Sequence, residues 1–182
     1  MSIKKIKKNL FIKTKRYFIR PIRVSDANIN YKRWFDGIND KFIQDSKKKE
    51  ITLGYLKEYI KKSLDNKNEI FLAIFTKKER HIGNIKFLKI DLKKKVSNLG
   101  IWIGDKNYQK KGVASETLSK LINFFFDKKL INKFELGVCV TNLKAIKLYK
   151  KLGFKKKSKI NNVLNMSLTK ISFYKNYQNF YF

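Results

Sequence analysis

The sequence predicts a single domain of the mixed α/β class, with helices packed on the faces of a central sheet. The length of 182 residues fits one domain, and hydrophobic residues make up 43% of the chain, enough to build a core. The apolar residues repeat with period two in some stretches and with helical spacing in others. That pattern is typical of a chain that mixes strands and helices.

The first half of the chain predicts two helices between strands. Thr52 is a suitable N-cap, and the apolar residues after it have helical spacing. The longest apolar run of the chain has six residues, so it fits a buried strand and is far too short to span a bilayer. In chain order we expect a strand over Tyr17–Ile22, a short helix over Asp26–Phe35 that ends near Gly37, a helix over Thr52–Leu64 and the buried strand Ile70–Phe75.

The second half begins with a predicted strand pair and then changes period. Leu118, Leu121, Ile122 and Phe125 have helical spacing, and Gly153 is a typical helix C-terminal residue. We expect strands over Arg80–Leu92 and Ser97–Ile103 around a turn at Lys93–Lys95, a helix over Val113–Phe126, a strand over Phe134–Val140, a helix over Ala145–Leu152, and last strands over Phe154–Lys159 and Val163–Thr169.

The two ends of the chain differ from the predicted domain in composition. Residues 1–15 form a basic N-terminal arm that we expect to be a solvated tail, and the domain proper extends over residues 16–170. Residues 171–182 form an aromatic tail, in which FYKNYQNFYF has six aromatics in ten residues. We expect the tail to pack on the domain, and a homodimer contact is the alternative.

The net charge of +30 comes from 44 basic against 14 acidic residues. Nucleic-acid readers favour Arg, whose planar group binds phosphate and guanine bidentately, but only five basic residues are Arg and the 39 Lys are spread along the chain. AT-rich codon usage explains such Lys excess, so we expect no dedicated nucleic-acid partner. The charge still attracts anionic small molecules and acidic surfaces.

The chain has one Cys and one His, too few for a His/Cys metal cluster, so we expect no metal. A single Cys also excludes a disulfide framework within the chain, which points to a reducing compartment. The basic N-terminal residues lack an apolar core region and a small-residue cleavage site, so we expect no signal peptide. These features predict a cytoplasmic protein.

The most informative stretch is Ile101–Ser115, in which a predicted strand is followed by a short loop and a helix. Backbone N–H groups at a helix N-terminus lack partners, and the helix dipole is positive there. Gly112 and Ala114 are small enough to let a phosphate approach the backbone. The spacing Gln-x-x-Gly-x-Ala from Gln109 to Ala114 is therefore suited to a pyrophosphate, although an ordinary turn before a helix has the same local pattern.

A second stretch, Asn142–Phe154, reads NLKAIKLYKKLGF. Asn142 follows a predicted strand and is suited to cap the next helix. Tyr149 lies on the apolar stripe of that helix, where a tyrosine most often belongs to the core.

Together, in this order, the two stretches resemble the GNAT superfamily of acetyl-CoA-dependent N-acetyltransferases. The first signature of the family matches Gln109, Gly112 and Ala114. The second signature, Asn-x-x-Ala-x-x-x-Tyr-x-x-x-Gly-Phe, matches Asn142, Ala145, Tyr149, Gly153 and Phe154. The phrases HIGNIKF and LGIWIGD are similar to family strands, and the resemblance is specific from Arg80 to Lys157. It implies a mostly antiparallel central sheet, and it is closest to the branch with ribosomal-protein, polyamine and nucleotide amino-sugar acetyltransferases.

The resemblance implies roles for particular residues. Tyr149 would protonate the departing CoA thiolate as a general acid. A strand backbone N–H would polarise the acetyl carbonyl. The expected acetyl-CoA contacts are the backbone of Trp102 and Ile103 for pantetheine, the loop residues Gln109, Lys110, Lys111, Gly112, Val113 and Ala114 for the pyrophosphate, and Asn142 for the pantetheine chain.

The sequence does not identify the residue that acts as the general base. Many related enzymes have a Glu on the strand before the cofactor loop, but Asn98 stands there. The candidates are Asp105, Asp91 or a water molecule held by the backbone. Cys139 offers a covalent acetyl route in principle, but no His is near it in sequence, and a single strand Cys is usually a small buried hydrophobe.

These observations favour an enzyme over a non-enzymatic RNA- or ribosome-binding module of the same fold. The tentative acceptor residues are Arg33, Trp34, Phe35 and His81, of which His81 is expected to be structural or at most a neighbour of the acceptor site. Aromatic faces stack on sugars and bases, and cations attract phosphates, so we expect an anionic small-molecule amine. A nucleotide-linked amino sugar ranks first, a protein N-terminus second and a polyamine last.

Overall fold

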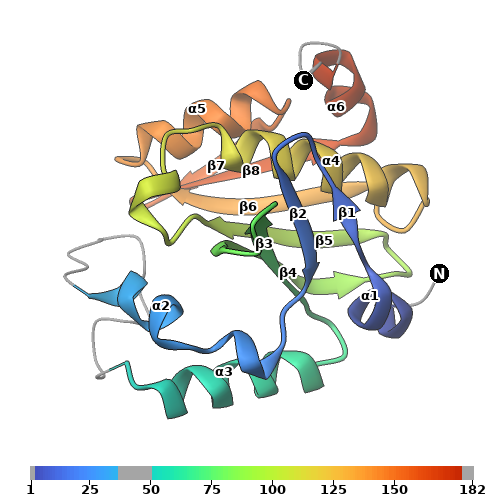
Figure 1. The fold of residues 1–182 in the computed structure, drawn as a ribbon. Helices are drawn as coiled ribbons and strands as arrows, with labels where there is room; N and C mark the ends of the chain where they lie inside the picture. Colours follow the sequence, from blue (N-terminus) through green and yellow to red (C-terminus); the bar gives the residue numbers. More distant parts are fainter. Residues whose placement is uncertain (1–2, 37–50, 178–182) are drawn as a thin grey trace.

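The computed structural model describes residues 3–36 and 51–177 and confirms the mixed α/β class. Within these residues, eight strands form one sheet in the order β1-β2-β3-β4-β5-β6-β8-β7, in which β5 and β6 pair in parallel and the other neighbours pair antiparallel (Figure 1). The strands are β1 Ile12–Lys13, β2 Tyr17–Pro21, β3 Ile70–Thr76, β4 His81–Asp91, β5 Val96–Trp102, β6 Lys133–Cys139, β7 Lys155–Ile160 and β8 Val163–Thr169.

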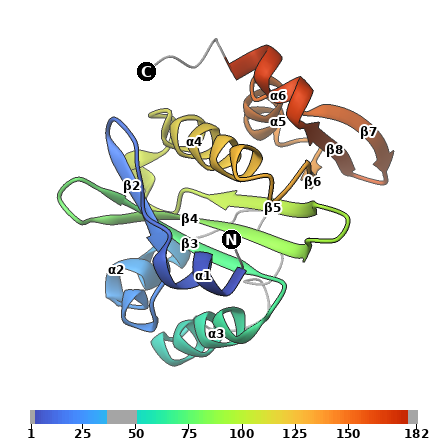
Figure 2. The same ribbon diagram turned by 90° about the vertical axis from the view of Figure 1, so that its right-hand side faces the viewer.

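Helices lie on both faces of this sheet (Figure 2). The α-helices are α1 Ile3–Asn9, α2 Ile29–Lys32, α3 Leu53–Asp65, α4 Val113–Asp127, α5 Leu143–Lys151 and α6 Lys170–Tyr177, and the 3₁₀ turns are η1 Val24–Asp26, η2 Arg33–Phe35 and η4 Lys106–Tyr108. Among the described residues, no helix has the length and apolar character needed to cross a bilayer.

The predicted elements agree with the structure wherever the apolar pattern was strong. All the predicted strands form, and the predicted caps Thr52 and Asn142 accept hydrogen bonds from the backbone of Tyr55 and Ala145. The predicted helix Asp26–Phe35 is wrong as one continuous helix, because the segment forms η1, α2 and η2, with Asn28 capping α2. Its predicted end, Gly37, lies outside the described residues.

Two apolar clusters lie on opposite faces of the sheet. The larger one joins the sheet to α4, with Leu118, Leu121 and Ile122 fully buried. The smaller one joins β2 and β3 to α2 and α3 through Leu56 and Ile60. The alternation along β3, in which even-numbered residues belong to the first cluster and odd-numbered ones to the second, explains why this strand is apolar throughout.

The expectation of a solvated N-terminal arm is wrong for the described part of residues 1–15. Ile6 of α1 and Leu10, which follows the helix, belong to the larger cluster, where they are 1% and 4% exposed. Lys7 donates hydrogen bonds from Nζ to the carbonyl oxygens of Leu64 (2.8 Å) and Asn66, at the end of α3. The segment packs because its apolar residues occur at helical spacing among the lysines, and the charge had masked this pattern.

The aromatic tail packs on the domain as far as it is described. Phe173 of α6 is fully buried, and the centroid of its ring lies 5.5 Å from that of Phe126 on α4. Tyr177 lies 4.8 Å from Phe173. Residues 178–182 of the predicted tail lie outside the described residues.

A buried carboxylate fastens the β1–β2 turn to the first turn of α4. Glu116, which is 1% exposed, accepts hydrogen bonds from Thr14 Oγ1 (2.6 Å), the Arg16 backbone (2.8 Å) and Arg16 Nε (2.7 Å). Burial alone would raise the pKa of Glu116, but these hydrogen bonds outweigh it and hold the pKa below its ordinary value.

We expect Glu116→Gln to lower the free energy of unfolding by about 1–3 kcal/mol at pH 7, because the charged hydrogen bonds are lost. Since the folded-state pKa lies below the ordinary value of 4.5, this stabilisation is complete above that pH and is lost as the pH falls through the folded-state value. Urea unfolding at several pH values measures the difference in unfolding free energy between the wild type and the variant. This difference must become smaller in acid. Glu58→Gln, at an exposed ion pair on α3, is the control and should leave the midpoint unchanged.

Candidate functional site

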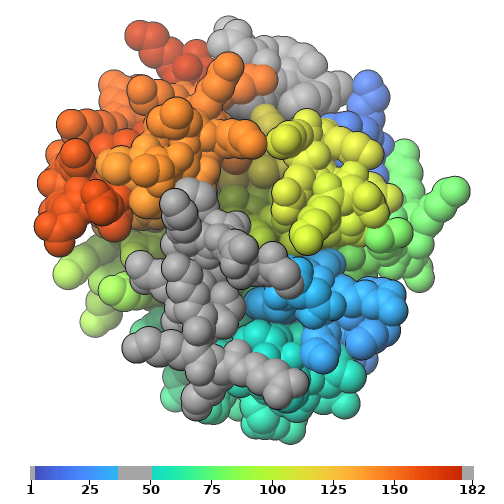
Figure 3. All heavy atoms as spheres, turned by 90° about the vertical axis from the view of Figure 1, so that its left-hand side faces the viewer, coloured from blue at the N-terminus to red at the C-terminus, as the bar shows by residue number. Residues whose placement is uncertain are grey.

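The candidate site begins where β5 and β6 separate. The two strands are paired at three positions, from Val96 opposite Lys133 to Asn98 opposite Glu135. Beyond these positions β5 stays paired with β4 as far as Trp102, and β6 stays paired with β8. Among the described strands, none covers the remaining edge of β5. Figure 3 shows this side of the molecule, hollowed between the loop before α4 (yellow) and α5 (orange).

The loop that follows β5 is held by bonds to its own residues and to β4. Asp105 Oδ1 accepts a hydrogen bond from the Asn107 backbone at 3.0 Å, and its Oδ2 pairs with Arg80 Nε at 2.7 Å. Gln109 Nε2 donates to the carbonyl of Ile103 at 2.9 Å. The predicted loop residue Gln109 therefore shapes the loop through its side chain.

The loop ends at Gly112, which precedes α4 in a left-handed conformation with φ of 76°. No side chain of the described residues caps this helix, so the N–H groups of its first turn have no side-chain acceptor there. A Cβ at Gly112 would lie 3.2 Å from a guanidinium nitrogen of Arg16. Arg16 is thus a cation at the α4 N-terminus that the sequence did not predict, because the contact joins segments far apart in the chain.

The second signature places its residues as expected of a capped helix. Asn142 Oδ1 accepts a hydrogen bond from the Ala145 backbone at 3.1 Å, which leaves its amide group as a donor. Tyr149 is 7% exposed and lies 5.5 Å from the Phe154 ring. Burial raises the pKa of Tyr149 to about 12, and no described residue bonds to its hydroxyl.

Two of the tentative acceptor residues, Trp34 and Phe35, contact Trp102 at the end of β5, and these three rings form an aromatic wall. Phe35 is half-buried and its ring lies 4.9 Å from that of Trp102. Trp34 is 6% exposed, lies 5.6 Å from Trp102 and covers Gly104, so it supports the wall from behind. Arg33, on the same 3₁₀ turn, is exposed.

His81 lies behind the same wall, and its structural reading is the better one for the acceptor side. Its ring is 8% exposed, stacks on Phe75 at 5.0 Å and meets Trp34 edge-on at 4.7 Å. His81 Nε2 lies 2.8 Å from Asn84 Oδ1 and 3.2 Å from the Gly83 carbonyl. Burial lowers the pKa of His81, so the ring is neutral at pH 7.

The two carboxylates that the sequence offered as general bases are engaged elsewhere. Asp105 holds the loop, and Asp91 accepts a hydrogen bond from the Lys94 backbone in the turn between β4 and β5. Glu135 is the carboxylate that lies across from Asn98, at the point where the strands separate. Sequence reasoning missed Glu135 because the pairing of β5 with β6 is a tertiary property.

Glu135 projects from the face of β6 opposite to its buried neighbours Phe134 and Leu136. Its Oε1 pairs with the ammonium groups of Lys133 at 2.8 Å and Lys157 at 3.2 Å. Hydrogen bonding to these lysines, chiefly Lys133, lowers the pKa of Glu135. The carboxylate is therefore ionised at neutral pH.

Cys139 lies at the end of β6 and is half-buried. Its Sγ lies 3.3 Å from Thr141 Oγ1. This contact supports the reading of Cys139 as a small strand residue.

A family model described as an acetyltransferase (GNAT) domain matches residues 16–155. Among curated proteins, the chain is 27% identical over 145 residues to the uncharacterized N-acetyltransferase p20 of Bacillus licheniformis. That match covers 79% of this chain and 81% of p20.

Two solved structures show the same fold. RimL, a ribosomal L7/L12 alpha-N-protein acetyltransferase in complex with coenzyme A, matches with a TM-score of 0.77 and 14% identity, covering 88% of this chain and 98% of RimL. Spermidine N-acetyltransferase from Vibrio cholerae, in complex with CoA and spermine, matches with a TM-score of 0.67 and 19% identity, covering 87% of this chain and 98% of that one. A shared fold does not by itself define a substrate.

We expect Gly104→Ala to displace the Trp34 ring, because the new Cβ would lie 2.1 Å from it. Such a clash in a packed cluster costs about 1–3 kcal/mol of unfolding free energy. Thermal unfolding measures the loss of stability, and tryptophan emission reports the displacement of the Trp34 ring. Gly100→Ala on β5 is the control, since a Cβ there has no atom within 4 Å. Equal stability of both variants would contradict the support assigned to Trp34.

Proposed function

The chain belongs to the GNAT family of N-acetyltransferases, and from this premise we propose that it transfers the acetyl group of acetyl-CoA to a primary amine of an anionic small molecule. The observation that carries the proposal is the uncovered edge of β5, which leads through one loop to the uncapped N-terminus of α4. An extended pantetheine chain fits such an edge as an added strand would. The helix terminus favours a pyrophosphate.

The residues proposed to hold acetyl-CoA divide by the chemistry that they offer. Backbone groups of β5 and of the first turn of α4 supply hydrogen bonds, and the Asn142 amide supplies a donor from the opposite side. Arg16, which is paired with Glu116 through Nε, places a second guanidinium nitrogen beside Gly112 as a donor. The proposed set is Trp102, Ile103, Gln109, Lys110, Lys111, Gly112, Val113, Ala114 and Asn142, with Arg16 added.

Tyr149 is the residue proposed to assist the leaving thiolate. With a pKa of about 12 its hydroxyl is protonated at neutral pH and ready to donate a hydrogen bond. A thiol has an ordinary pKa of about 8.5, so complete proton transfer from Tyr149 would be uphill. The raised pKa therefore favours stabilisation of the sulfur by a hydrogen bond, and water completes the protonation.

The proposed acceptor is anionic, with a nucleotide-linked amino sugar favoured. Arg33 and the ring of Phe35 offer a cation and an aromatic face at the end of β5. Lys133 and Lys157 add positive charge on the side of Glu135. A phosphate-bearing sugar complements this surface, whereas a polyamine is repelled by the net charge of +30.

The second candidate is a protein N-terminus. RimL is a ribosomal-protein acetyltransferase that matches this fold with the higher TM-score of the two structures above. The cationic surface disfavours basic N-terminal segments but accepts acidic ones. A free polyamine ranks third.

An acceptor panel tests this proposal. Purified protein with acetyl-CoA receives a UDP- or dTDP-linked 4-amino sugar, an acidic or basic N-terminal peptide, or spermidine, and CoA release is followed. We expect turnover of the amino sugar, and Tyr149→Phe should lower kcat by about 10²-fold while acetyl-CoA affinity changes little. Turnover of spermidine alone would overturn the charge argument, and turnover of a peptide alone would promote the second candidate.

We also propose that Glu135 orients the acceptor amine. Both lysines bond to its Oε1, and in this proposal Oε2 receives an ammonium or a water that removes the proton. Its place opposite Asn98 puts the carboxylate where the strands begin to separate. The carboxylate that the sequence lacks at Asn98 is thus supplied by the neighbouring strand.

Glu135→Gln should lower kcat/KM by about 10- to 100-fold, because the charge that attracts the amine is removed. Since the pKa of Glu135 lies below its ordinary value, the carboxylate is ionised throughout pH 6–9, and the loss should be largest at low pH and shrink as the acceptor amine loses its own proton at high pH. Asp91→Asn is the matched control and should keep full activity. A loss that grows with rising pH, or an equal loss in the control, would remove this role.

A further inference from the structure

One strand glycine beside the opening between β5 and β6 has no packing reason to be a glycine. The described strands contain Gly83, Gly100 and Gly137. A Cβ at Gly83 would lie 2.7 Å from the carbonyl oxygen of Trp102, and one at Gly137 would lie 3.0 Å from Val163 Cγ1, so close neighbours explain both. A Cβ at Gly100 would meet no atom of the described residues within 4 Å.

The backbone conformation does not require a glycine at this position either. In the described part of the chain, Gly112 and Gly153 have a positive φ, and Gly100 does not. Glycine weakens the interior of a strand, because it loses more conformational freedom on folding than other residues and has no side chain to pack. A strand glycine that folding does not need often marks the close approach of a ligand.

Gly100 faces the side of the sheet opposite to α4. Its neighbours Leu99 and Ile101 pack in the larger cluster with α4, so Asn98 and Gly100 face the other side. Asn98 is the last residue of β5 that pairs with β6, and its partner there is Glu135. Gly100 is therefore the first residue on this face of β5 beyond the point where the strands separate.

Two groups bound the space over Gly100 along β5. Trp102, two residues later, belongs to the aromatic wall, and Asn98, two residues earlier, lies opposite Glu135. Alternate residues of a strand are about 6.6 Å apart, so Asn98 and Trp102 are about 13 Å apart along β5. This leaves room for a ring between an aromatic face and a carboxylate.

The side chain next to Gly100 on β4 leaves this space open. Lys86 is the residue that pairs with Gly100. Its ammonium group lies 4.6 Å from the ring of Phe71 on β3 and 3.5 Å from Glu69. Lys86 therefore leans over β3, away from β5.

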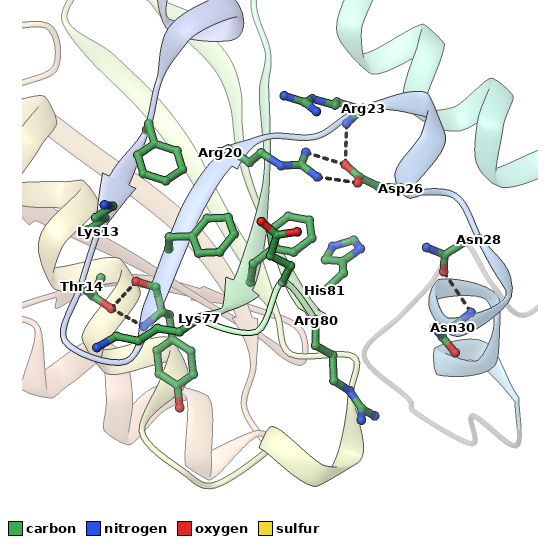
Figure 4. A pocket seen from close by; sticks show the side chains of 15 residues that line it. Lys13, Thr14, Arg20, Arg23, Asp26, Asn28, Asn30, Lys77, Arg80 and His81 are labelled. Atoms are coloured by element: carbon green, nitrogen blue, oxygen red, sulfur yellow. Dashed lines mark hydrogen bonds and ion pairs between the residues drawn. The ribbon is translucent and has the colours of Figure 1, made fainter.

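The aromatic wall is supported on its far side. Trp34 meets His81 edge-on at 4.7 Å, and His81 stacks on Phe75 at 5.0 Å. Figure 4 shows His81 near the paired side chains of Arg20 and Asp26, which are joined by two bonds of 2.8 and 2.7 Å. Packed and paired groups thus stand behind the wall, which makes it a firm boundary of the space over Gly100.

We propose that Gly100 determines the acceptor specificity of the proposed acetyl transfer, and this inference rests on that proposed function. The bare backbone at Gly100 receives a sugar-like ring that bears the amine, with the ring beside Trp102 and the amine directed to Glu135. A side chain at position 100 would occupy the space of the ring, whereas an amine at the end of an unbranched chain needs less of it. The missing side chain therefore selects a ring-borne amine over a linear one.

The variants Gly100→Ala and Gly100→Val test this role. We expect both to melt no lower than the wild type and to bind CoA with an affinity within about twofold of it, because the added groups enter open space. For a UDP- or dTDP-linked 4-amino sugar, kcat/KM should fall by about tenfold in Gly100→Ala and by about 100-fold in Gly100→Val. For O-phosphoethanolamine, which has an amine and a phosphate but no ring, it should change by less than about threefold.

Ser158→Val on β7 is the matched control. It adds a β-branched side chain on the same face of the sheet, where β6 and β8 separate it from the opening. We expect this variant to keep the wild-type kcat/KM for both acceptors.

Several results would overturn the inference. An equal change for the ring-borne and the linear amine in Gly100→Val, or no change for either, would remove the role of Gly100. A lower melting temperature or a lost affinity for CoA would show that the space is not open to an acceptor. Wild-type turnover of O-phosphoethanolamine as fast as that of the sugar would do the same for the ring. Turnover of no amine by the wild type would remove the proposed function itself, and this outcome is seen before any substitution is made.

Discussion

The separation of β5 from β6 is the constraint on which the rest of the structure depends. Separated strands leave backbone groups without partners, which is unfavourable unless water or a substrate bonds to them. The separation persists because each strand is paired along its outer side, β5 with β4 and β6 with β8. The same three paired positions that end at Asn98 also bring Glu135 to the start of the opening.

A cluster of rings connects this opening to the opposite side of the sheet. Trp102 ends β5 and contacts Trp34 and Phe35, and Trp34 in turn contacts His81. Gly104 leaves the space that the Trp34 ring fills. Of the aromatic residues of η2, Trp34 is therefore buried behind Trp102, and Phe35 keeps part of its ring exposed beside it.

Each buried carboxylate in the described part of this basic chain joins two elements. Glu116 fastens the β1–β2 turn to α4, Asp105 joins the loop after β5 to Arg80 just before β4, and Asp26 joins η1 to the neighbouring strand β2 through Arg20. Buried charges need such partners to offset desolvation. The acidic residues thus do structural work, while most of the lysine excess lies on the surface, where it sets the long-range attraction for anions.

The sequence alone determined the mixed α/β class, most element positions and the GNAT family, because periodicity, the caps Thr52 and Asn142 and the spacing around Gly112 and Tyr149 are local properties. It misjudged residues 3–13, whose lysines hid a short apolar stripe. Only the tertiary structure decided which carboxylate stands at the strand separation, which cation lies beside Gly112 and how His81 is enclosed. Those properties arise from contacts between segments far apart in the chain, and no local pattern records them.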